Sequence, residues 1–204
     1  MSHAQAVDPA EPAVETYNGK LAMWLFLCSE VMFFSGILGA YITLRLSHPG
    51  LFEASQEKLH HHVALAAFNT VLLITSSLTM ALAVVNGQAK NTAKQRFFLL
   101  LTAAMGTLFL VLKFYEYHTH LHPVAGLDGI IPPVENPAHD IFFAFYYTIT
   151  GLHGFHILCG VIPIMGLWYF AGKRDVSCET EMVGLYWHFV DLVWIFLFPL
   201  LYLI

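Results

Sequence analysis

Five long apolar blocks constrain the fold of this chain more than any other feature of its sequence. They cover approximately residues 21–44, 63–85, 97–115, 141–171 and 182–204. Only 11% of the residues are charged, whereas a soluble domain carries about 25% charged residues. Each block is close to the length of about 20 residues that a helix needs to cross the hydrocarbon core of a bilayer.

Helices are the only secondary structure that fits these blocks. Backbone amides find no hydrogen-bond partner in lipid, so only helices and closed barrels span a membrane, and a barrel needs alternating segments of about ten residues. The sequence therefore predicts an all-α integral membrane protein, with five transmembrane helices forming a single bundle over residues 20–204. Residues 1–19 hold three acids and no apolar core, and we expect a short acidic tail there, disordered or lying on the surface.

The positions of lysine and arginine predict how the bundle is oriented. Six lie on the side of the membrane that holds the N-terminus: Lys20, Lys90, Lys94, Arg96, Lys173 and Arg174. Three lie on the other side: Arg45, Lys58 and Lys113. Because loops rich in Lys and Arg stay in the cytoplasm, we expect a cytoplasmic N-terminus, a periplasmic C-terminus and a location in the inner (plasma) membrane of a cell.

Glu30 is the only charged side chain between residues 21 and 44. At about 1.5 Å per helical residue it lies roughly 14 Å into the span, near the middle of a core about 30 Å thick. A charge there costs on the order of 2.5 kcal/mol or more. We therefore expect the Glu30 carboxyl to face protein or water and to exchange a proton.

Other polar side chains also lie inside the predicted spans. They are Asn69, Glu116, His153, His156, His188 and Asp191. His153 and His156 are three residues apart, as are His188 and Asp191, so each pair shares one face of its helix. The imidazole and carboxylate of His188 and Asp191 can bond to each other or to partners on the fourth span. We expect these intramembrane polar residues to hold the helices in register. Glu116 lies three residues after Lys113, which makes an ion pair between them expected.

The sequence gives little sign of a cofactor. Only three histidines lie well inside spans, fewer than the four that two bis-histidine haems need, and we expect neither a metal nor a cofactor site in this chain. The three cysteines have no paired spacing, which argues against a disulfide or a thiolate metal site. In the external loops, His118, His120 and His122 could bind a divalent ion, although a solvated loop is the simpler interpretation.

Five stretches of the sequence, taken in order, resemble the cytochrome c oxidase subunit III family. They are MWLFLCSEVMFFSGILGAY, FNTVLLITSS, KFYEY, TGLHGFHILCG and YWHFVDLVWIFLFPLLY. Each contains an intramembrane polar residue, and together they cover nearly all of the chain from Leu21 onwards. Members of the family commonly have seven helices, and this chain resembles the last five of them, as in a short bacterial form.

This resemblance implies a role in a respiratory haem–copper oxidase, which reduces oxygen to water and translocates protons. Subunit III itself holds no redox centre, so haem and copper are expected in partner subunits. The resemblance implies that it packs against the catalytic subunit I and contacts other oxidase subunits and membrane lipid, including bound phospholipid. It also implies that the chain supports the stability and proton uptake of subunit I. By the same resemblance, Glu30 matches a buried carboxyl that reacts with a hydrophobic carbodiimide, a reaction that requires a protonated acid.

Two other functions fit the same pattern. One is the related accessory protein of a nitric oxide reductase system, which has the same fold. The other is a stand-alone transporter of protons or solutes, which is disfavoured because no span is broken at mid-membrane by a Pro or Gly pair facing a cavity. No nucleic acid is expected as a partner.

Overall fold

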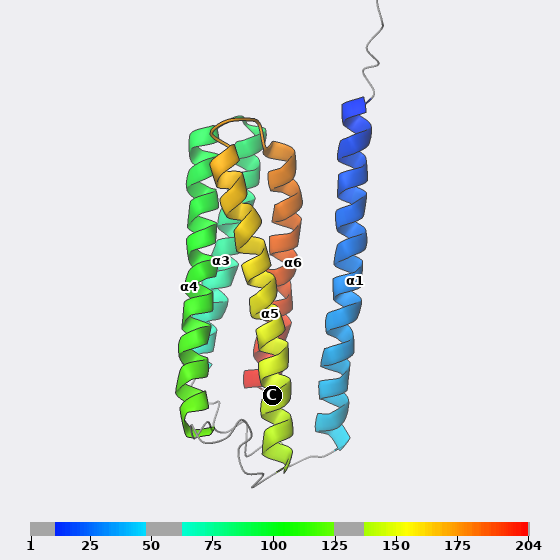
Figure 1. Ribbon diagram of the computed structural model, residues 1–204, viewed down its shortest axis with the longest axis vertical. Helices are drawn as coiled ribbons and strands as arrows, with labels where there is room; N and C mark the ends of the chain where they lie inside the picture. Colours follow the sequence, from blue (N-terminus) through cyan, green and yellow to red (C-terminus); the bar gives the residue numbers. More distant parts are fainter. Residues whose placement is uncertain (1–10, 48–62, 125–136, 204) are drawn as a thin grey trace, which may run out of the picture.

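The computed structural model describes residues 11–47, 63–124 and 137–203, and all regular structure in them is helical. Four helices form an antiparallel bundle, and α1 lies along its side next to α5 and α6 (Figure 1). The helices are α1 (Glu11–Ser47), α3 (Val63–Gln88), α4 (Thr92–Val124), α5 (Pro137–Phe170) and α6 (Ser177–Tyr202).

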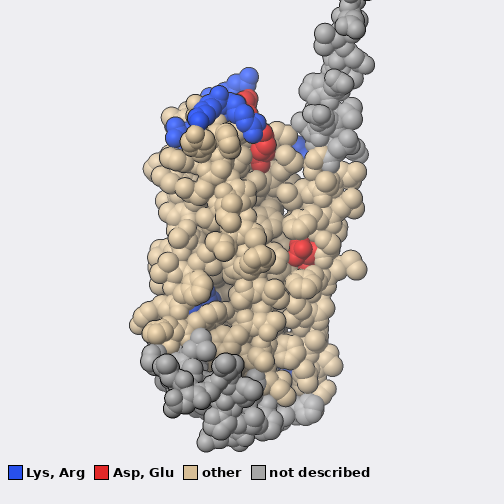
Figure 2. Space-filling model, in the orientation of Figure 1, with Lys and Arg blue, Asp and Glu red and all other residues tan. Residues whose placement is uncertain are grey.

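Each of the five helices is long and apolar enough to cross a membrane. The candidate spans are Gly19–Ser47, Val63–Gln88, Thr92–His118, Ile141–Phe170 and Ser177–Tyr202. Figure 2 shows a tan, largely uncharged flank, with lysine and arginine gathered at one end of the molecule. The predicted all-α fold with five membrane-spanning helices is confirmed, and the chain is a multi-pass membrane protein.

The helices extend beyond the predicted spans. α1 begins at Glu11, about ten residues before the first predicted span. Glu and Ala are good helix formers, and Pro12 lies in the first turn, where a missing amide hydrogen does no harm. α4 continues to Val124. α5 begins at Pro137, where proline is again compatible with the first turn of a helix.

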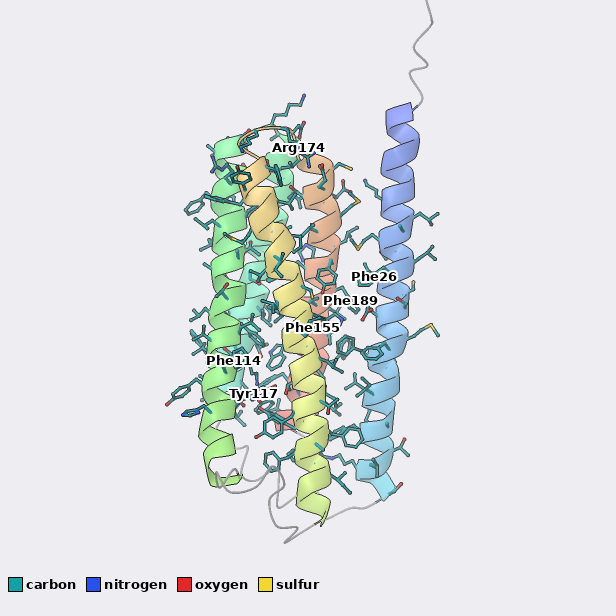
Figure 3. All side chains as sticks on the ribbon, viewed as in Figure 1. Phe26, Phe114, Tyr117, Phe155, Arg174 and Phe189 are labelled. Atoms are coloured by element: carbon teal, nitrogen blue, oxygen red, sulfur yellow. The ribbon has the colours of Figure 1, made fainter. Side chains whose placement is uncertain are left out.

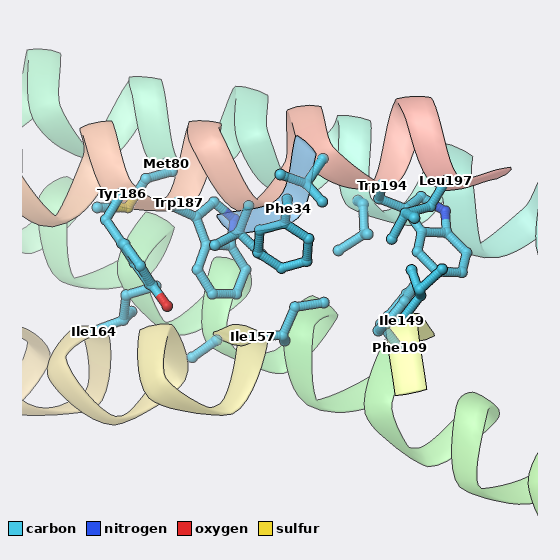
Figure 4. Close-up of a cluster of buried hydrophobic side chains, with 14 of the residues drawn as sticks. Phe34, Met80, Phe109, Ile149, Ile157, Ile164, Tyr186, Trp187, Trp194 and Leu197 are labelled. Atoms are coloured by element: carbon cyan, nitrogen blue, oxygen red, sulfur yellow. The ribbon is translucent and has the colours of Figure 1, made fainter. Parts of the chain in front are cut away.

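Trp187 of α6 contacts the other three helices of the bundle. Its ring lies against Gly106 of α4 and Gly160 of α5, where an added Cβ would come within 2.6 and 2.8 Å of ring carbons. Its indole Nε1 donates a hydrogen bond of 3.0 Å to Ser76 Oγ of α3. Figure 4 shows Trp187 within the buried apolar cluster, near Ile157. The two glycines thus leave room for the largest side chain at the centre of the bundle.

α1 is attached more loosely than the other helices. Its buried apolar residues are Leu27, Phe34 and Tyr41, which are seven apart and form one stripe along the helix. A Cβ added at Gly36 or Gly39 would meet no atom within 4 Å. One face of α1 therefore packs on α5 and α6, and most of its remaining surface is open to lipid or to a partner.

Candidate functional site

Glu30 of α1 faces His156 of α5. The distance from Glu30 Oε2 to His156 Nε2 is 3.0 Å, and His156 Nδ1 lies 2.7 Å from the carbonyl oxygen of Leu152. A carbonyl oxygen can only accept, so Nδ1 must carry a hydrogen and donate it. His156 Nε2 then either accepts a hydrogen bond from a protonated Glu30 or, as imidazolium, donates one to the carboxylate. A hydrogen bond between the two side chains therefore needs one hydrogen, carried either by the Glu30 carboxyl or by His156 Nε2.

The surroundings of this pair are apolar but not sealed. The side chains of Glu30 and His156 are 19% and 13% exposed. The ring of Phe34 lies edge-on to the imidazole, with centroids 5.1 Å apart. Figure 3 shows Phe26 and Phe189 at the space where α1 meets α6, and Phe189 also lies 6.4 Å from Phe34 between ring centroids. A hydrophobic reagent can therefore approach the carboxyl from the side of the bundle.

A second polar cluster lies within the bundle near the opposite end from the basic loops. Lys113 Nζ donates to Glu116 Oε2 at 2.9 Å, and the two side chains are 6% and 0% exposed. Tyr146 of α5 and Tyr202 of α6 each donate a hydrogen bond to Glu116 Oε1, at 2.7 and 2.5 Å. The predicted pairing of Lys113 with Glu116, both in α4, is confirmed. The two tyrosines connect this pair to α5 and α6.

Further contacts of Lys113 tie this cluster together. Its ammonium group donates a 2.7 Å hydrogen bond to Tyr202 Oη. It also lies 4.7 Å from the ring centroid of Trp194, within the range of a cation–π interaction. Tyr146 and Tyr202 were not predicted from the sequence to belong to the Lys113–Glu116 cluster. A tyrosine hydroxyl inside an apolar span needs a hydrogen-bond partner. That requirement is the feature of the sequence that could have indicated a role for both tyrosines.

The two histidines of α5 have different surroundings although they share a helix face. His156 reaches α1, whereas His153 is fully buried in the bundle and stacks on Trp194, with ring centroids 5.0 Å apart and planes at 28°. Neither ring nitrogen of His153 has a hydrogen-bond partner among the described residues. His153 is therefore part of the core and does not take part in the contact between Glu30 and His156.

From their spacing, His188 and Asp191 of α6 could have bonded to each other or to α5. In the structure they do neither. His188 Nδ1 lies 2.5 Å from Ser77 Oγ of α3. Ser76 and Ser77 lie near the Asp191 carboxyl, but in the described part of the chain neither carboxyl oxygen makes a hydrogen bond of normal geometry. Both polar side chains of α6 thus face α3.

Asn69 of α3 is fully buried. Its amide nitrogen and oxygen find no hydrogen-bond partner within residues 11–47, 63–124 and 137–203. A buried polar group left unpaired costs about 1–3 kcal/mol. Asn69, His153 and Asp191 are therefore interior polar positions that packing alone does not account for.

The described residues contain no group of three or more His, Cys, Asp or Glu side chains that could hold a metal ion. The three cysteines, of which Cys28 and Cys159 are exposed, are free. The hypothesis of a metal site at His118, His120 and His122 concerns mainly side chains outside those that the structure describes. Among the described residues, the geometry defines a multi-pass membrane bundle with a lateral hydrogen-bonded pair, Glu30 and His156, and a buried ion pair, Lys113 and Glu116.

Comparison with known proteins identifies the family of this bundle. The family model for cytochrome c oxidase subunit III matches residues 11–204. The cytochrome c oxidase subunit 3 of Bacillus subtilis strain 168 is 31% identical over 202 residues, which cover 96% of this chain and 92% of that protein. The chain therefore belongs to the cytochrome c oxidase subunit III family.

Two further relatives differ in their partners or domain content. The haem–copper oxidase subunit I+III of Aeropyrum pernix strain K1 is 32% identical over 191 residues, which cover 90% of this chain and 22% of that protein. The probable quinol oxidase subunit 3 of Staphylococcus epidermidis strain RP62A is 26% identical over 212 residues, which cover all of this chain and 97% of that protein. The chain is thus similar in sequence both to a relative named as a cytochrome c oxidase subunit and to one named as a quinol oxidase subunit.

Proposed function

We propose that this chain, as the subunit III of a respiratory haem–copper oxidase, stabilises the catalytic subunit I and sustains its proton uptake without carrying a redox centre. The complex reduces oxygen to water, with haem and copper in partner subunits. The observation that carries the proposal is the 3.0 Å contact between Glu30 Oε2 and His156 Nε2 at the side of the bundle. In this proposal the two groups share a proton and exchange it with a neighbouring surface.

Association with subunit I has independent support. In the Aeropyrum pernix relative, the region similar to this chain belongs to a protein named subunit I+III, so the two subunits are joined in one polypeptide there. Fusion of this kind favours partners that lie next to each other in the complex. The bundle would sit in the inner membrane with its basic end in the cytoplasm, in keeping with the positive-inside rule, and its apolar flank would contact other subunits and phospholipid.

The remaining polar residues of the spans have structural roles in this proposal. Glu116 holds α4, α5 and α6 together through Lys113 and the two tyrosines. His188 ties α6 to α3 through Ser77. His153, Asp191 and Asn69 lie in the interior of the bundle, where in this proposal they help to keep the helices in register. None of them contacts the Glu30 carboxyl, so proton exchange is assigned to the Glu30–His156 pair alone.

Glu30→Gln in the assembled oxidase is expected to abolish labelling by a hydrophobic carbodiimide, because the reaction needs a protonated carboxyl. Initial oxygen reduction should be nearly unchanged, since the redox centres lie elsewhere. The number of turnovers before inactivation should fall several-fold. Labelling is measured by mass spectrometry of the chain, and turnover with an oxygen electrode. The proposal fails if both labelling and long-term turnover stay as in the parent complex.

His156→Gln tests whether sustained turnover needs the Glu30–His156 pair or only the Glu30 carboxyl. Glutamine can still hydrogen-bond to Glu30 but cannot carry the proton, so Glu30 should remain labelled while sustained turnover falls as in Glu30→Gln. Glu181→Gln is the matched control, because that carboxyl pairs with Lys20 at 2.8 Å at the basic end and should leave both readouts unchanged. If His156→Gln turned over like the parent, Glu30 would act without histidine.

The two alternatives are weaker. An accessory protein of a nitric oxide reductase system would share the fold, but the relatives above are named as oxidase subunits. A stand-alone transporter predicts proton flux in liposomes that contain this chain alone. The spectrum and activity of the co-purifying partner complex distinguish all three functions.

A further inference from the structure

A pocket of about 500 Å³ opens at the basic end of the bundle, between the α3–α4 and α5–α6 connections. Its walls include Lys90, Lys173 and Arg174, against a single carboxylate, Asp175. Figure 2 shows the cluster of lysine and arginine at this end, and Figure 3 places Arg174 there. The proton-sharing pair lies elsewhere, at the side of the bundle, so the pocket is a separate feature.

The positive charges of the pocket are only partly compensated. Arg174 pairs with Glu179, but the ammonium of Lys173 donates to the neutral hydroxyl of Tyr169. Asp175 accepts hydrogen bonds from the hydroxyl and the amide of Ser177, which together with the charge of Lys90 hold its pKa below the usual range. The carboxylate is thus engaged by Ser177 at the start of α6.

Arg96 adds a positive charge behind the wall at Gly172. A Cβ added at Gly172 would lie 3.1 Å from a guanidinium nitrogen of Arg96. That guanidinium stacks over the ring of Trp168, 4.8 Å from its centroid, and its Nε is buried without a hydrogen-bond partner in the described part of the chain. Among the described residues, Arg96 has no acidic side chain as a partner, and its guanidinium is held by the Trp168 ring.

Lys90 occupies a position that normally belongs to glycine. The amides of Lys90 and Asn91 bond to the carbonyls of Gly87 and Asn86, each at 2.9 Å, which is the Schellman arrangement at the end of a helix. Lys90 takes the left-handed conformation that this arrangement requires, with φ 55°. Glycine adopts it without strain, so the lysine is unfavourable for the backbone but places an ammonium group in the pocket wall.

We propose that this pocket binds the phosphate group of an anionic ligand. The pocket lies where the membrane spans Val63–Gln88, Thr92–His118, Ile141–Phe170 and Ser177–Tyr202 end or begin, which is the depth of lipid headgroups. The phosphate can come from an anionic phospholipid or from a water-soluble phosphate ester. In either case Lys90 and Lys173 make the charge-assisted contacts, and Arg96 adds to the field.

Lys90→Gly tests the site without weakening the fold. In full-length chain purified in a neutral detergent, native mass spectrometry should show phosphatidylglycerol retained in preference to phosphatidylcholine. Lys90→Gly should reduce the affinity for phosphatidylglycerol about tenfold or more, the effect of losing a charge-assisted contact. Its melting temperature should equal or exceed that of the parent, because glycine relieves the left-handed strain.

Lys94→Gln is the matched control, because Lys94 is only four residues from Lys90 along the chain but lies outside this pocket. It should leave phosphatidylglycerol retention unchanged. A competition with glycerol phosphate identifies the source: displacement of the lipid indicates a site for soluble phosphate, and no displacement indicates a lipid site. The proposal is wrong if phosphatidylcholine is retained equally, if Lys90→Gly has no effect, or if Lys94→Gln has the same effect as Lys90→Gly.

Discussion

Replacing Glu116 by leucine is expected to lower the free energy of unfolding by about 3–5 kcal/mol, the usual cost of removing one partner from a buried ion pair. Lys113 is only 5% exposed and would be left buried without its carboxylate partner. Tyr146 and Tyr202 would lose their common acceptor at the same time. The change is measured by unfolding the chain with increasing SDS in mild detergent and following its helical circular dichroism.

The double variant Lys113→Met with Glu116→Leu should recover most of this loss. Two apolar side chains of similar size leave no uncompensated charge, and such replacements of buried pairs are often neutral or stabilising. A single variant within about 1 kcal/mol of the parent, or a double variant no more stable than the single one, would contradict a buried pair at this position.

The fold was predictable because one property of the sequence dominates it. In lipid an unpaired backbone amide costs several kcal/mol, so each long apolar block has to be a helix. The ends of the helices were less predictable, since Pro12 and Pro137 lie in the first turns of α1 and α5. At that position proline is compatible with a helix, whereas its presence in sequence alone indicates a boundary without giving its exact residue.

The partners of the polar residues were harder to predict than their burial. Glu30 was expected to face protein, and the structure places it against His156. His153, one turn earlier on α5, looks equivalent in sequence but stacks on Trp194 instead. The difference comes from the rotation of α5 relative to α1, which depends on packing between helices. Spacing along one helix does not contain that information, whereas the local pair of Lys113 and Glu116 was predictable from spacing.

Gly160→Ala is expected to destabilise the bundle by about 1–3 kcal/mol, as extra atoms do in a well-packed core. The new methyl group would lie 2.8 Å from a ring carbon of Trp187. The ring has no room to move towards α4, because it already lies against Gly106, where an added Cβ would come within 2.6 Å of a ring carbon. The resulting shift should also lengthen the hydrogen bond from Trp187 to Ser76, and a change in tryptophan fluorescence would report it.

Gly154→Ala provides the control on the same helix. A Cβ at Gly154 would make ordinary contact with Leu110 at 3.6 Å, and alanine is favoured over glycine in a helix by roughly 0.5–1 kcal/mol. Gly154→Ala should therefore be neutral or slightly stabilising by the same SDS titration. Trp187→Phe should reduce the cost of Gly160→Ala, because the smaller ring leaves room for the methyl group. An equal cost in both backgrounds would mean that Gly160 serves something other than the Trp187 ring.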